Sequence, residues 1–402
     1  DLRMSRGLGD VYKRQELLNP EGATYSWLVN GKEYSTEPTF SYKIDNPCRA
    51  DLSCIIKNKY GKVEMSTSFS SNHNFSKGFF YVADGTFNFY DTEKKTAYQD
   101  CYASLNAGKT LGIGNYDSAN IIHSNGKFYL LVGTSTSNRD HFYIVDAKTL
   151  YYENSAVVGA NLSGLTILNE QYGLVTGDGI RRIDLKSLNN VRIKNQRLLC
   201  FYNSIIYNGK VLSNDTYKDE SKVKYYDVNE LIAAKEGEAP AVTELDIIQK
   251  QKINFVLAKD GNVYTLESAD NGCNIVKIKN DFTLEKVFAN FQPAKGPYHS
   301  SPTIGMVASE TENIIYLVST DGAIYKYILG DSDSLKAPFI AAESGVSITA
   351  PLQLNQQSGE LYVTYTEERK DESKIVVYSK DGKVLHTVDC GESVPSQILF
   401  NN

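Results

Sequence analysis

Between Lys77 and the C-terminus, short apolar runs alternate with polar turns in a pattern that repeats seven times. The runs begin at intervals of 39 to 52 residues, with a mean period close to 47. They start near Phe79, Lys127, Gln171, Lys210, Asn262, Ile314 and Glu360. Short runs rich in Val, Ile, Leu, Tyr and Phe are typical of buried β-strands. The region is therefore predicted to contain seven copies of one β-unit.

Each run is followed, after a polar loop of variable length, by a second predicted strand. These second strands cover residues 87–91, 141–146, 180–184, 223–227, 274–278, 323–327 and 374–378. Four of the seven end in aspartate, namely Asp91, Asp146, Asp184 and Asp227. A carboxylate at the end of a strand can accept a backbone N–H bond from two residues on, which starts a turn. We predict that these four aspartates are structural.

The repeat length predicts the fold. Repeats of about 40 to 50 residues with several strands each are typical of β-propeller blades, whose sheet edges are protected by radial packing. The first repeat lacks the inner strand that precedes later ones, such as residues 119–123 or 303–307. The last residues, 395–400, have the apolar character of such a strand. We predict that they complete the first blade, so that both ends of the region share one sheet and close a ring of seven blades.

Residues 16–70 alternate apolar and polar positions as a half-buried sheet does. One predicted strand, 25–29, is followed by Asn30-Gly31, and a later one covers residues 51–56. Asn-Gly supplies the two positive φ angles that a type I′ hairpin turn requires. Trp27 is predicted to lie in the core of a β-sandwich rather than to bind a ligand.

Both regions resemble known families. The segments 25–31 and 56–61, with Trp27 and the Asn-x-Tyr-Gly turn, resemble PKD-like immunoglobulin-type sandwich domains. The repeated strand pair resembles the YVTN-type surface propellers of secreted bacterial proteins. A sandwich followed by a propeller is similar to the PKD-like outer-membrane lipoproteins that accompany TonB-dependent uptake systems. The resemblance implies a lipid-tethered protein of the cell envelope, surface-exposed or periplasmic. Such a protein would capture a nutrient, glycan or cofactor for a transporter, with the sandwich as spacer.

Residues 5–15 resemble the translation of a sequencing adapter joined to a gene assembled from environmental DNA. We therefore assign residues 1–15 to an artefactual or disordered tail, 16–70 to an N-terminally truncated PKD-like sandwich, and 77–402 to the propeller. On this interpretation a signal peptide and a lipid-attachment cysteine were lost upstream. A genuine basic tail is the alternative.

Composition narrows the function classes. The chain carries 42 Lys and Arg against 48 Asp and Glu, a net charge of −6, so it offers no basic field for nucleic acid. No apolar run approaches the ~20 residues needed to cross a bilayer. The 28 tyrosines favour half-buried strands. We expect an all-β globular protein that contacts a membrane only through a lipid anchor.

The residues that most often carry catalysis are dispersed. Six cysteines and five histidines show no metal-binding spacing, and no hydrolase, nucleotide-binding or dinucleotide motif is present. The propeller cysteines, one to each of several strands, are predicted to be buried free thiols. A disulfide between Cys48 and Cys54 in an oxidising compartment is the alternative. We predict no metal and no cofactor.

The candidate binding residues lie in loops that a propeller gathers around the mouth of its channel. Aromatic faces beside hydrogen-bonding groups suit a sugar or a flat cofactor. The candidates are Tyr116, Asp117, Arg139, His141, Tyr217, Tyr298, His299 and Arg369, with Phe291 nearby. Tyr298 and His299 are favoured because prolines at 297 and 302 hold their loop on both sides.

Two other functions stay open at this point. A glycoside hydrolase or polysaccharide lyase would need two carboxyl groups about 5 to 9.5 Å apart, and the loop acids Asp117, Asp140, Asp219 and Glu367 are candidates. A protein–protein scaffold is the second alternative. Acidic loop residues are usually just solvated, so a non-enzymatic binding protein is the interpretation that we favour.

Overall fold

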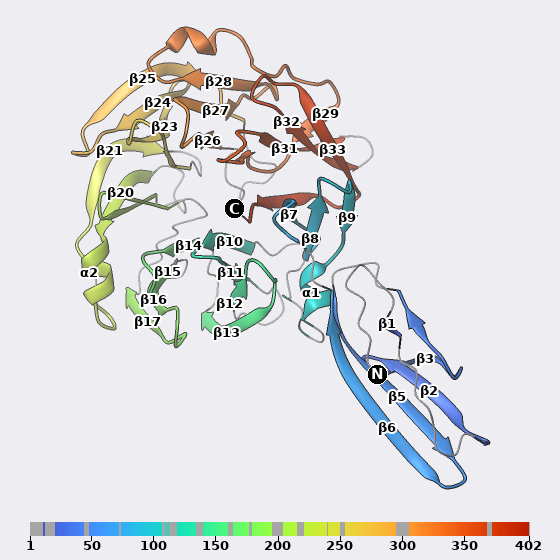
Figure 1. Ribbon diagram of the computed structural model, residues 1–402. Helices are drawn as coiled ribbons and strands as arrows, with labels where there is room; N and C mark the ends of the chain where they lie inside the picture. Colours follow the sequence, from blue (N-terminus) through green and yellow to red (C-terminus); the bar gives the residue numbers. More distant parts are fainter. Residues whose placement is uncertain are drawn as a thin grey trace.

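The computed structural model of the 402-residue chain describes residues 11–12, 21–43, 48–71, 74–106, 109, 111, 119–133, 140–159, 164–176, 179–194, 204–214, 221–238, 240–249, 254–294, 305–367 and 372–401. Over these residues the regular structure is almost entirely β. Figure 1 shows a ring of sheets around a centre, with one further sheet projecting outward beside α1 (Cys101–Leu105). The predicted all-β fold, a sandwich-like sheet followed by a seven-bladed propeller, is confirmed.

The first four blades each contain four antiparallel strands, ordered from the centre outward. Blade 1 consists of β34 (Pro395–Leu399), β7 (Gly78–Ala83), β8 (Thr86–Asp91) and β9 (Thr96–Tyr98). Blade 2 consists of β10 (Ala119–Ser124), β11 (Lys127–Val132), β12 (Asp140–Asp146) and β13 (Tyr152–Gly159). Blade 3 consists of β14 (Gly164–Ile167), β15 (Tyr172–Thr176), β16 (Ile180–Asp184) and β17 (Asn190–Lys194). Blade 4 consists of β18 (Ile205–Tyr207), β19 (Lys210–Asn214), β20 (Ser221–Asp227) and β21 (Thr243–Gln249).

The last three blades vary in their strands. Blade 5 consists of β22 (Val256–Leu257), β23 (Val263–Ala269), β24 (Gly272–Ile278) and β25 (Leu284–Phe291). In blade 6 the described strands are β26 (Met306–Ala308), β27 (Ile314–Val318) and β28 (Ile324–Ile328), followed by a 3₁₀-helix, Ser332–Leu335. Blade 7 consists of β29 (Val346–Ile348) and β30 (Gln353–Leu354), which both pair with β31 (Leu361–Glu367), then β32 (Ser373–Tyr378) and β33 (Val384–Gly391).

The ring closes as the sequence predicts. The C-terminal strand β34 pairs antiparallel with β7, and Ile398 lies opposite Tyr81. The first blade is therefore built from segments more than 300 residues apart in the chain. No covalent bond is needed for closure, because the backbone hydrogen bonds of this strand pair join the two ends.

The hydrophobic core of the propeller consists of seven clusters, and each one lies between two consecutive blades. Successive side chains of β7 point to opposite faces of the blade, which explains this arrangement. Phe79 and Tyr81 pack against blade 7, whereas Phe80 and Val82 pack against blade 2. Both faces of a blade are therefore apolar, which is why the strands read as nearly continuous apolar runs.

The projecting sheet has the order β3 (Lys32–Ser35), β2 (Thr24–Val29), β5 (Arg49–Asn58), β6 (Gly61–Ser70). Its hairpin turn has the predicted positive angles, φ 51° at Asn30 and 79° at Gly31. Trp27 is 3% exposed in a core of six buried residues, and its Nε1 donates to the Glu37 carbonyl at 2.9 Å. The predicted core role of Trp27 is confirmed.

A two-stranded sheet accompanies the larger one. It joins β1 (Val11–Tyr12) to β4 (Ser41–Tyr42). Hence two residues of the segment assigned to a tail pair with the sandwich.

Two short helices lie on the rim of the ring. They are α1 and α2 (Val228–Ala233), which begin after Asp100 and Asp227, and both aspartates accept N–H bonds from the first turn. In the described ranges, no helix combines the length and the apolar character that crossing a bilayer demands.

Candidate functional site

Of the eight candidate binding residues, His141 alone lies within the described residues. The other seven, Tyr116, Asp117, Arg139, Tyr217, Tyr298, His299 and Arg369, lie outside them. His141 is half-buried on β12, next to the loop that joins β11 to β12. Its ring stacks on Tyr143, with the centroids 5.9 Å apart and the planes at 23°. His141 thus lies at the end of blade 2 that carries the β11–β12 loop, and its role in binding stays a prediction.

Phe291 was expected at the mouth, and this expectation is wrong. The side chain is 6% exposed on β25, within the cluster between blades 5 and 6. Its ring meets Tyr325 edge to face at 5.8 Å. An aromatic residue at a strand end packs into the blade interface because that interface removes its surface from water.

The described acids of the alternative hydrolase site are separated. Asp140 is 4% exposed on β12 of blade 2, and Glu367 ends β31 of blade 7. Blade 1 lies between these two blades in the ring (Figure 1). The other two acids, Asp117 and Asp219, lie outside the described residues.

The four aspartates that end the second strands all bind the backbone that follows, three in turns and one as a helix cap. Asp91 Oδ1 accepts from the backbone N–H of Glu93 and Lys94 at 3.0 and 2.8 Å. Asp146 and Asp184 make the equivalent bonds in blades 2 and 3. Asp227 instead caps α2. The structural role of all four is confirmed.

These contacts also determine the charge state of the carboxyl groups. The pKa of Asp184 lies below its ordinary value because the Ser187 N–H donates to it, supported by the Ser187 hydroxyl. The pKa of Asp227 is lowered by Lys210 Nζ, which donates to Oδ2 at 2.7 Å. In the described part of the chain, every carboxyl group whose pKa departs clearly from its ordinary value has a lowered pKa. These groups are held as anions, the opposite of what a general acid requires at neutral pH.

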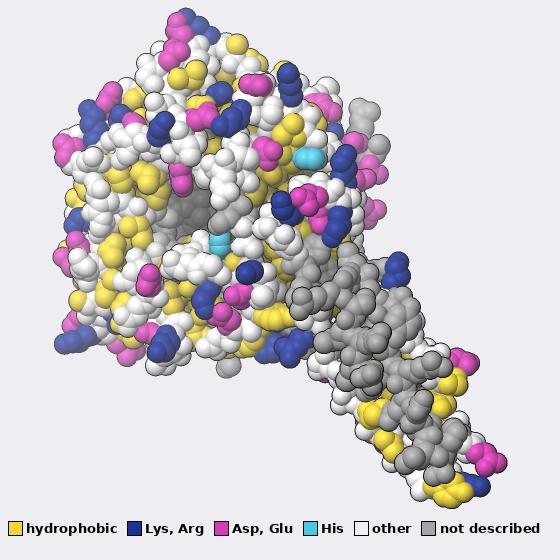
Figure 2. All heavy atoms as spheres, viewed as in Figure 1, with side chains coloured by type: hydrophobic (Ala, Val, Ile, Leu, Met, Phe, Trp, Pro, Cys, Tyr) yellow, Lys and Arg dark blue, Asp and Glu magenta, His cyan; other side chains and the backbone are white. Residues whose placement is uncertain are grey.

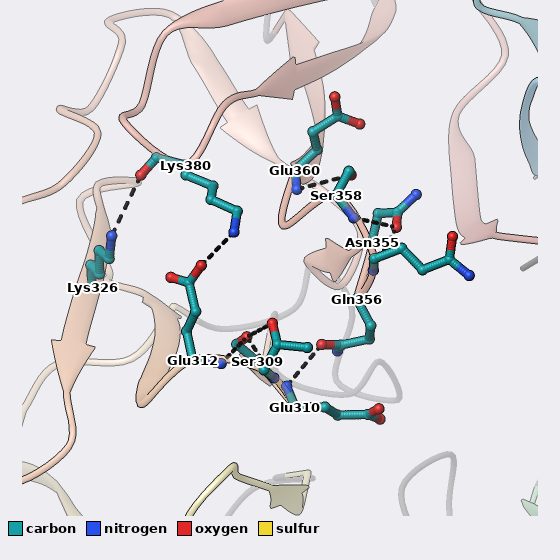
Figure 3. A network of polar contacts seen from close by, with 11 residues as sticks. Ser309, Glu310, Glu312, Lys326, Asn355, Gln356, Ser358, Glu360 and Lys380 are labelled. Atoms are coloured by element: carbon teal, nitrogen blue, oxygen red, sulfur yellow. Dashed lines mark hydrogen bonds and ion pairs between the residues drawn. The ribbon is translucent and has the colours of Figure 1, made fainter.

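Neutral side chains join the inner strands of neighbouring blades. Figure 3 shows one such contact, in which Gln356 after β30 binds the backbone of blade 6. Its Nε2 donates to the Ala308 carbonyl at 3.0 Å, and its Oε1 accepts from the Glu310 N–H at 2.9 Å. Farther out, Lys380 pairs with Glu312 across the same interface.

Similar hydrogen bonds from side-chain amides to backbone groups join other pairs of blades. Asn254 bonds to both the N–H and the carbonyl of Met306, joining blades 5 and 6. Gln397 of β34 donates to the Ile121 carbonyl at 2.8 Å, joining blades 1 and 2. Because amides satisfy backbone groups that no strand pair reaches, these side chains are structural.

A buried amide near the mouth has no hydrogen-bond partner among the described residues. Asn120 on β10 is 8% exposed, and its Nδ2 has no hydrogen-bond partner among the described residues. Asn120 lies at the loop end of the inner strand of blade 2. It shares a face with Leu131 and Phe142, whereas His141 pairs with Val132 on the opposite face, so the structure does not bring Asn120 and His141 together. Asn120 is not among the residues predicted from the sequence, because its neighbours are ordinary strand residues.

The described cysteines form no disulfide. Cys48, Cys54, Cys101, Cys273 and Cys390 carry thiols, so the alternative of a Cys48–Cys54 disulfide is not realised. Burial raises the pKa of Cys101 and Cys390 to about 12 and that of Cys273 to about 11. Cys101 begins helix α1, which corrects the assignment of every propeller cysteine to a strand. Cys200 lies outside the described residues.

Metal-ligating side chains do not gather in this part of the chain. In the ranges that the structure covers, no three or more His, Cys, Asp or Glu residues are grouped so that they could hold a metal ion. On the face seen in Figure 2, basic and acidic side chains are mixed around the rim, without one basic patch.

Comparison with known proteins finds a matching family model and a solved relative. Residues 75–401 match the model of a domain of unknown function, DUF5074. The chain is 98% identical to a quinonprotein alcohol dehydrogenase-like protein from Bacteroides thetaiotaomicron VPI-5482, whose crystal structure has been solved. The match covers 98% of this chain and 95% of that one, with a TM-score of 0.93.

More distant structures resemble the ring. The Dos1 propeller matches with 10% identity and a TM-score of 0.48, over 78% of this chain and 85% of that chain. Hsv2p of Kluyveromyces lactis matches with 11% identity and a TM-score of 0.42, over 82% and 97%. Likenesses this distant carry no argument about function. Among curated proteins, none matches the chain significantly.

Proposed function

The chain belongs to the DUF5074 family, and from this premise we propose that it is a non-enzymatic binding protein of the bacterial cell envelope. It captures a nutrient, glycan or cofactor for a TonB-dependent outer-membrane transporter. A lipid anchor upstream holds it at the membrane, and the sandwich serves as a spacer. The sequence resemblance to PKD-like surface lipoproteins supports this placement.

The observation that carries the proposal is how the ring uses its polar side chains. The described carboxylates with shifted pKa values are anions held in turns, caps and ion pairs, and the amides between blades bind backbone groups. A scaffold of this kind presents loops rather than an acid–base pair.

The ligand is proposed to lie at the mouth, on the face that carries the loops between second and third strands. Asn120 supports this location, since its Nδ2 has no partner among the described residues and a ligand or water there can supply an acceptor. The loop residues Tyr298 and His299 remain the favoured candidates for stacking and hydrogen bonding.

The name of the 98% identical relative points to quinone-dependent alcohol dehydrogenases. A quinone cofactor is a flat, polar ring system that needs an enclosed site with unused polar groups. The described side chains that join the inner strands are neutral, and they already bind the neighbouring blade. These bridging amides offer such a cofactor no unused group, and we propose no redox step.

The proposal is tested by isothermal titration of the full chain against a panel of oligosaccharides and cobamides, beside a hydrolysis and lyase assay of the same panel. We expect binding without turnover. The double change Tyr298→Ala with His299→Ala should weaken binding by about tenfold or more, because stacking and hydrogen bonding are both lost. The melting temperature should stay nearly constant.

The matched control is Tyr60→Ala, which removes a 69% exposed tyrosine at the tip of the sandwich hairpin. It should leave binding unchanged. Turnover that is abolished by an Asp or Glu substitution would establish the hydrolase or lyase alternative instead. A silent panel with a co-purifying transporter would favour the scaffold, and a large fall in melting temperature for the double variant would show that the loop is structural.

A further inference from the structure

A cavity of about 620 Å³ lies where the sandwich joins the ring. Its walls come from three places in the chain, namely the linker between β6 and β7, the turn between β12 and β13 of blade 2, and the end of the chain after β34. Leu105 of α1 adds an apolar wall. The volume falls within the range of about 300 to 1,000 Å³ that is typical of small-molecule sites.

The linker wall is held in place at both ends. Ser71 exchanges hydrogen bonds with Cys48, with its N–H donating to the carbonyl at 2.9 Å and its Oγ accepting from the N–H at 2.8 Å. Phe75 is 3% exposed and packs against Phe80 and Phe89, with ring centroids 5.1 and 4.9 Å away. The linker is therefore anchored in blade 1 and is not a free tether.

The blade 2 turn is held just as firmly. Asp146 Oδ1 accepts from the N–H and the hydroxyl of Thr149 at 2.8 and 2.7 Å. Asn106 bonds to the backbone on both sides of Tyr151, at Leu150 and Tyr152. Asn401 Nδ2 donates to the Ala147 carbonyl at 2.7 Å. Walls that are ordered before a ligand arrives lower the entropic cost of binding.

Three polar groups of the cavity lining are available to bind a ligand. Lys148 is exposed and has no ion-pair partner among the described residues, and no described lining residue is acidic. Asn74 uses Oδ1 to accept from Ser76, which leaves its Nδ2 as a donor. Asn401 uses Nδ2, which leaves its Oδ1 as an acceptor.

An aromatic face and a second cation complete the set. Tyr151 lines the cavity, and the guanidinium of Arg49, from β5 of the sandwich, lies 5.9 Å from its ring centroid. An aromatic ring beside neutral amides and hydroxyls suits the apolar face and the hydroxyl groups of a sugar ring. Lys148 in the lining and Arg49 beside Tyr151, with no acidic residue among the described lining residues, favour a negatively charged ligand.

We propose that the junction cavity binds a saccharide that carries a carboxylate, of the uronic or sialic acid class. Tyr151 packs against the sugar ring, Asn74 and Asn401 bind its hydroxyl groups, and Lys148 pairs with the carboxylate. Arg49 strengthens the positive field, so the sandwich contributes to a site and is more than a spacer. This site is separate from the mouth of the ring.

The test is isothermal titration of the full chain with trigalacturonate and 3′-sialyllactose, using the methyl ester of the first and lactose as uncharged counterparts. The variant is Lys148→Gln. Its matched control is Lys186→Gln, because Lys186 occupies the equivalent position in the Asp184–Leu188 turn of blade 3 and is also exposed. Both variants should melt like the wild type, since both side chains lie in solvent.

We expect at least one charged probe to bind, and Lys148→Gln to weaken it by about tenfold or more, as for loss of a charged hydrogen bond. Lys186→Gln should have no effect, and the uncharged counterparts should bind about tenfold more weakly to the wild type. The proposal is overturned if neither charged probe binds, if the counterparts bind equally well, or if both lysine variants behave alike.

The mouth variant separates this proposal from the proposed function. Tyr298→Ala with His299→Ala should leave binding of the charged probe intact. Loss of that binding would place the saccharide at the mouth, which would contradict the junction site while leaving a binding function for the ring in place.

Discussion

The propeller and the sandwich bury their apolar residues in different ways. In β7 every residue after the first is buried, because the strand packs against a blade on each face. In β6 no residue is fully buried, and Val63 is 51% exposed. A propeller strand therefore depends on two neighbours, whereas the sandwich has its own core of six buried residues around Trp27.

This difference indicates which part of the molecule should unfold cooperatively. Each of the seven core clusters of the ring is shared by two blades, so no blade can be removed without exposing two clusters. The sandwich has a core of its own and meets the ring through the Phe75 anchor, the α1 contact with β5 and the contact of Arg49 with Tyr151.

We expect the largest effect from a deletion at one of the two ends of the chain. Removing residues 395–402 takes away β34, exposes the edge of β7 and opens the cluster that contains Ile398. We expect the chain to fail to fold or the melting temperature of the ring to fall by more than about 10 °C. Calorimetry of the purified chain measures it.

Removal of residues 1–70, which retains Phe75, is the matched deletion. It should move the transition of the ring by less than about 3 °C. Equal effects from both deletions would show that the sandwich and the ring form one cooperative unit.

The second prediction compares two buried aromatic residues. Phe79 is fully buried and meets Tyr362 of blade 7 at 5.0 Å, and Trp27 is 3% exposed in the sandwich. Each change to alanine should cost about 3 to 5 kcal/mol, because it removes a large apolar side chain and leaves a cavity.

The two substitutions should destabilise different unfolding transitions. Phe79→Ala should lower the calorimetric transition of the ring, and Trp27→Ala only that of the sandwich. If Trp27→Ala destabilises the ring by a similar amount, the two regions are coupled more tightly than their separate cores indicate.

The smallest effect concerns one turn of the ring. Hydrogen bonds from Ser187 lower the pKa of Asp184 in the folded state below its ordinary 3.8, so the anion stabilises the fold above that pH. This contribution is lost as the pH falls through the folded pKa. Asp184→Asn should cost less than about 1 kcal/mol at neutral pH, because asparagine keeps an acceptor oxygen and loses only the charge.

Urea unfolding at pH values of about 6 and about 3 checks the sign. The wild type should lose more stability than Asp184→Asn on acidification. Lys186→Gln in the same turn is the control and should follow the wild type. Identical pH dependence of the wild type and Asp184→Asn would contradict the assigned role of the carboxylate.

Much of the architecture was predictable because its signals are local. The repeated apolar runs, the aspartates at strand ends and the Asn30-Gly31 turn each act within a few residues, and the structure confirms all three. The closing strand was also predictable, since the first repeat lacked an inner strand. The helix at Cys101 and the burial of Phe291 were not, because tertiary packing overrides local preference at element ends.

The candidate sites also differ in whether the sequence alone could predict them. The approximate positions of loops between strands follow from repeat boundaries, and His141 lies at the start of β12, beside one of them. The unpartnered amide of Asn120 and the cavity beside Lys148 could not be predicted, because both depend on groups that only folding brings near or keeps away.

The amino-acid sequence by itself determined the number of blades, the faces of the strands and the turns, since period-2 alternation and turn chemistry act between near neighbours in the chain. The tertiary structure alone decided that Ser71, Lys148 and Asn401 line one cavity. The physical reason is that ring closure joins segments more than 300 residues apart, and no local pattern records which side chains then face each other.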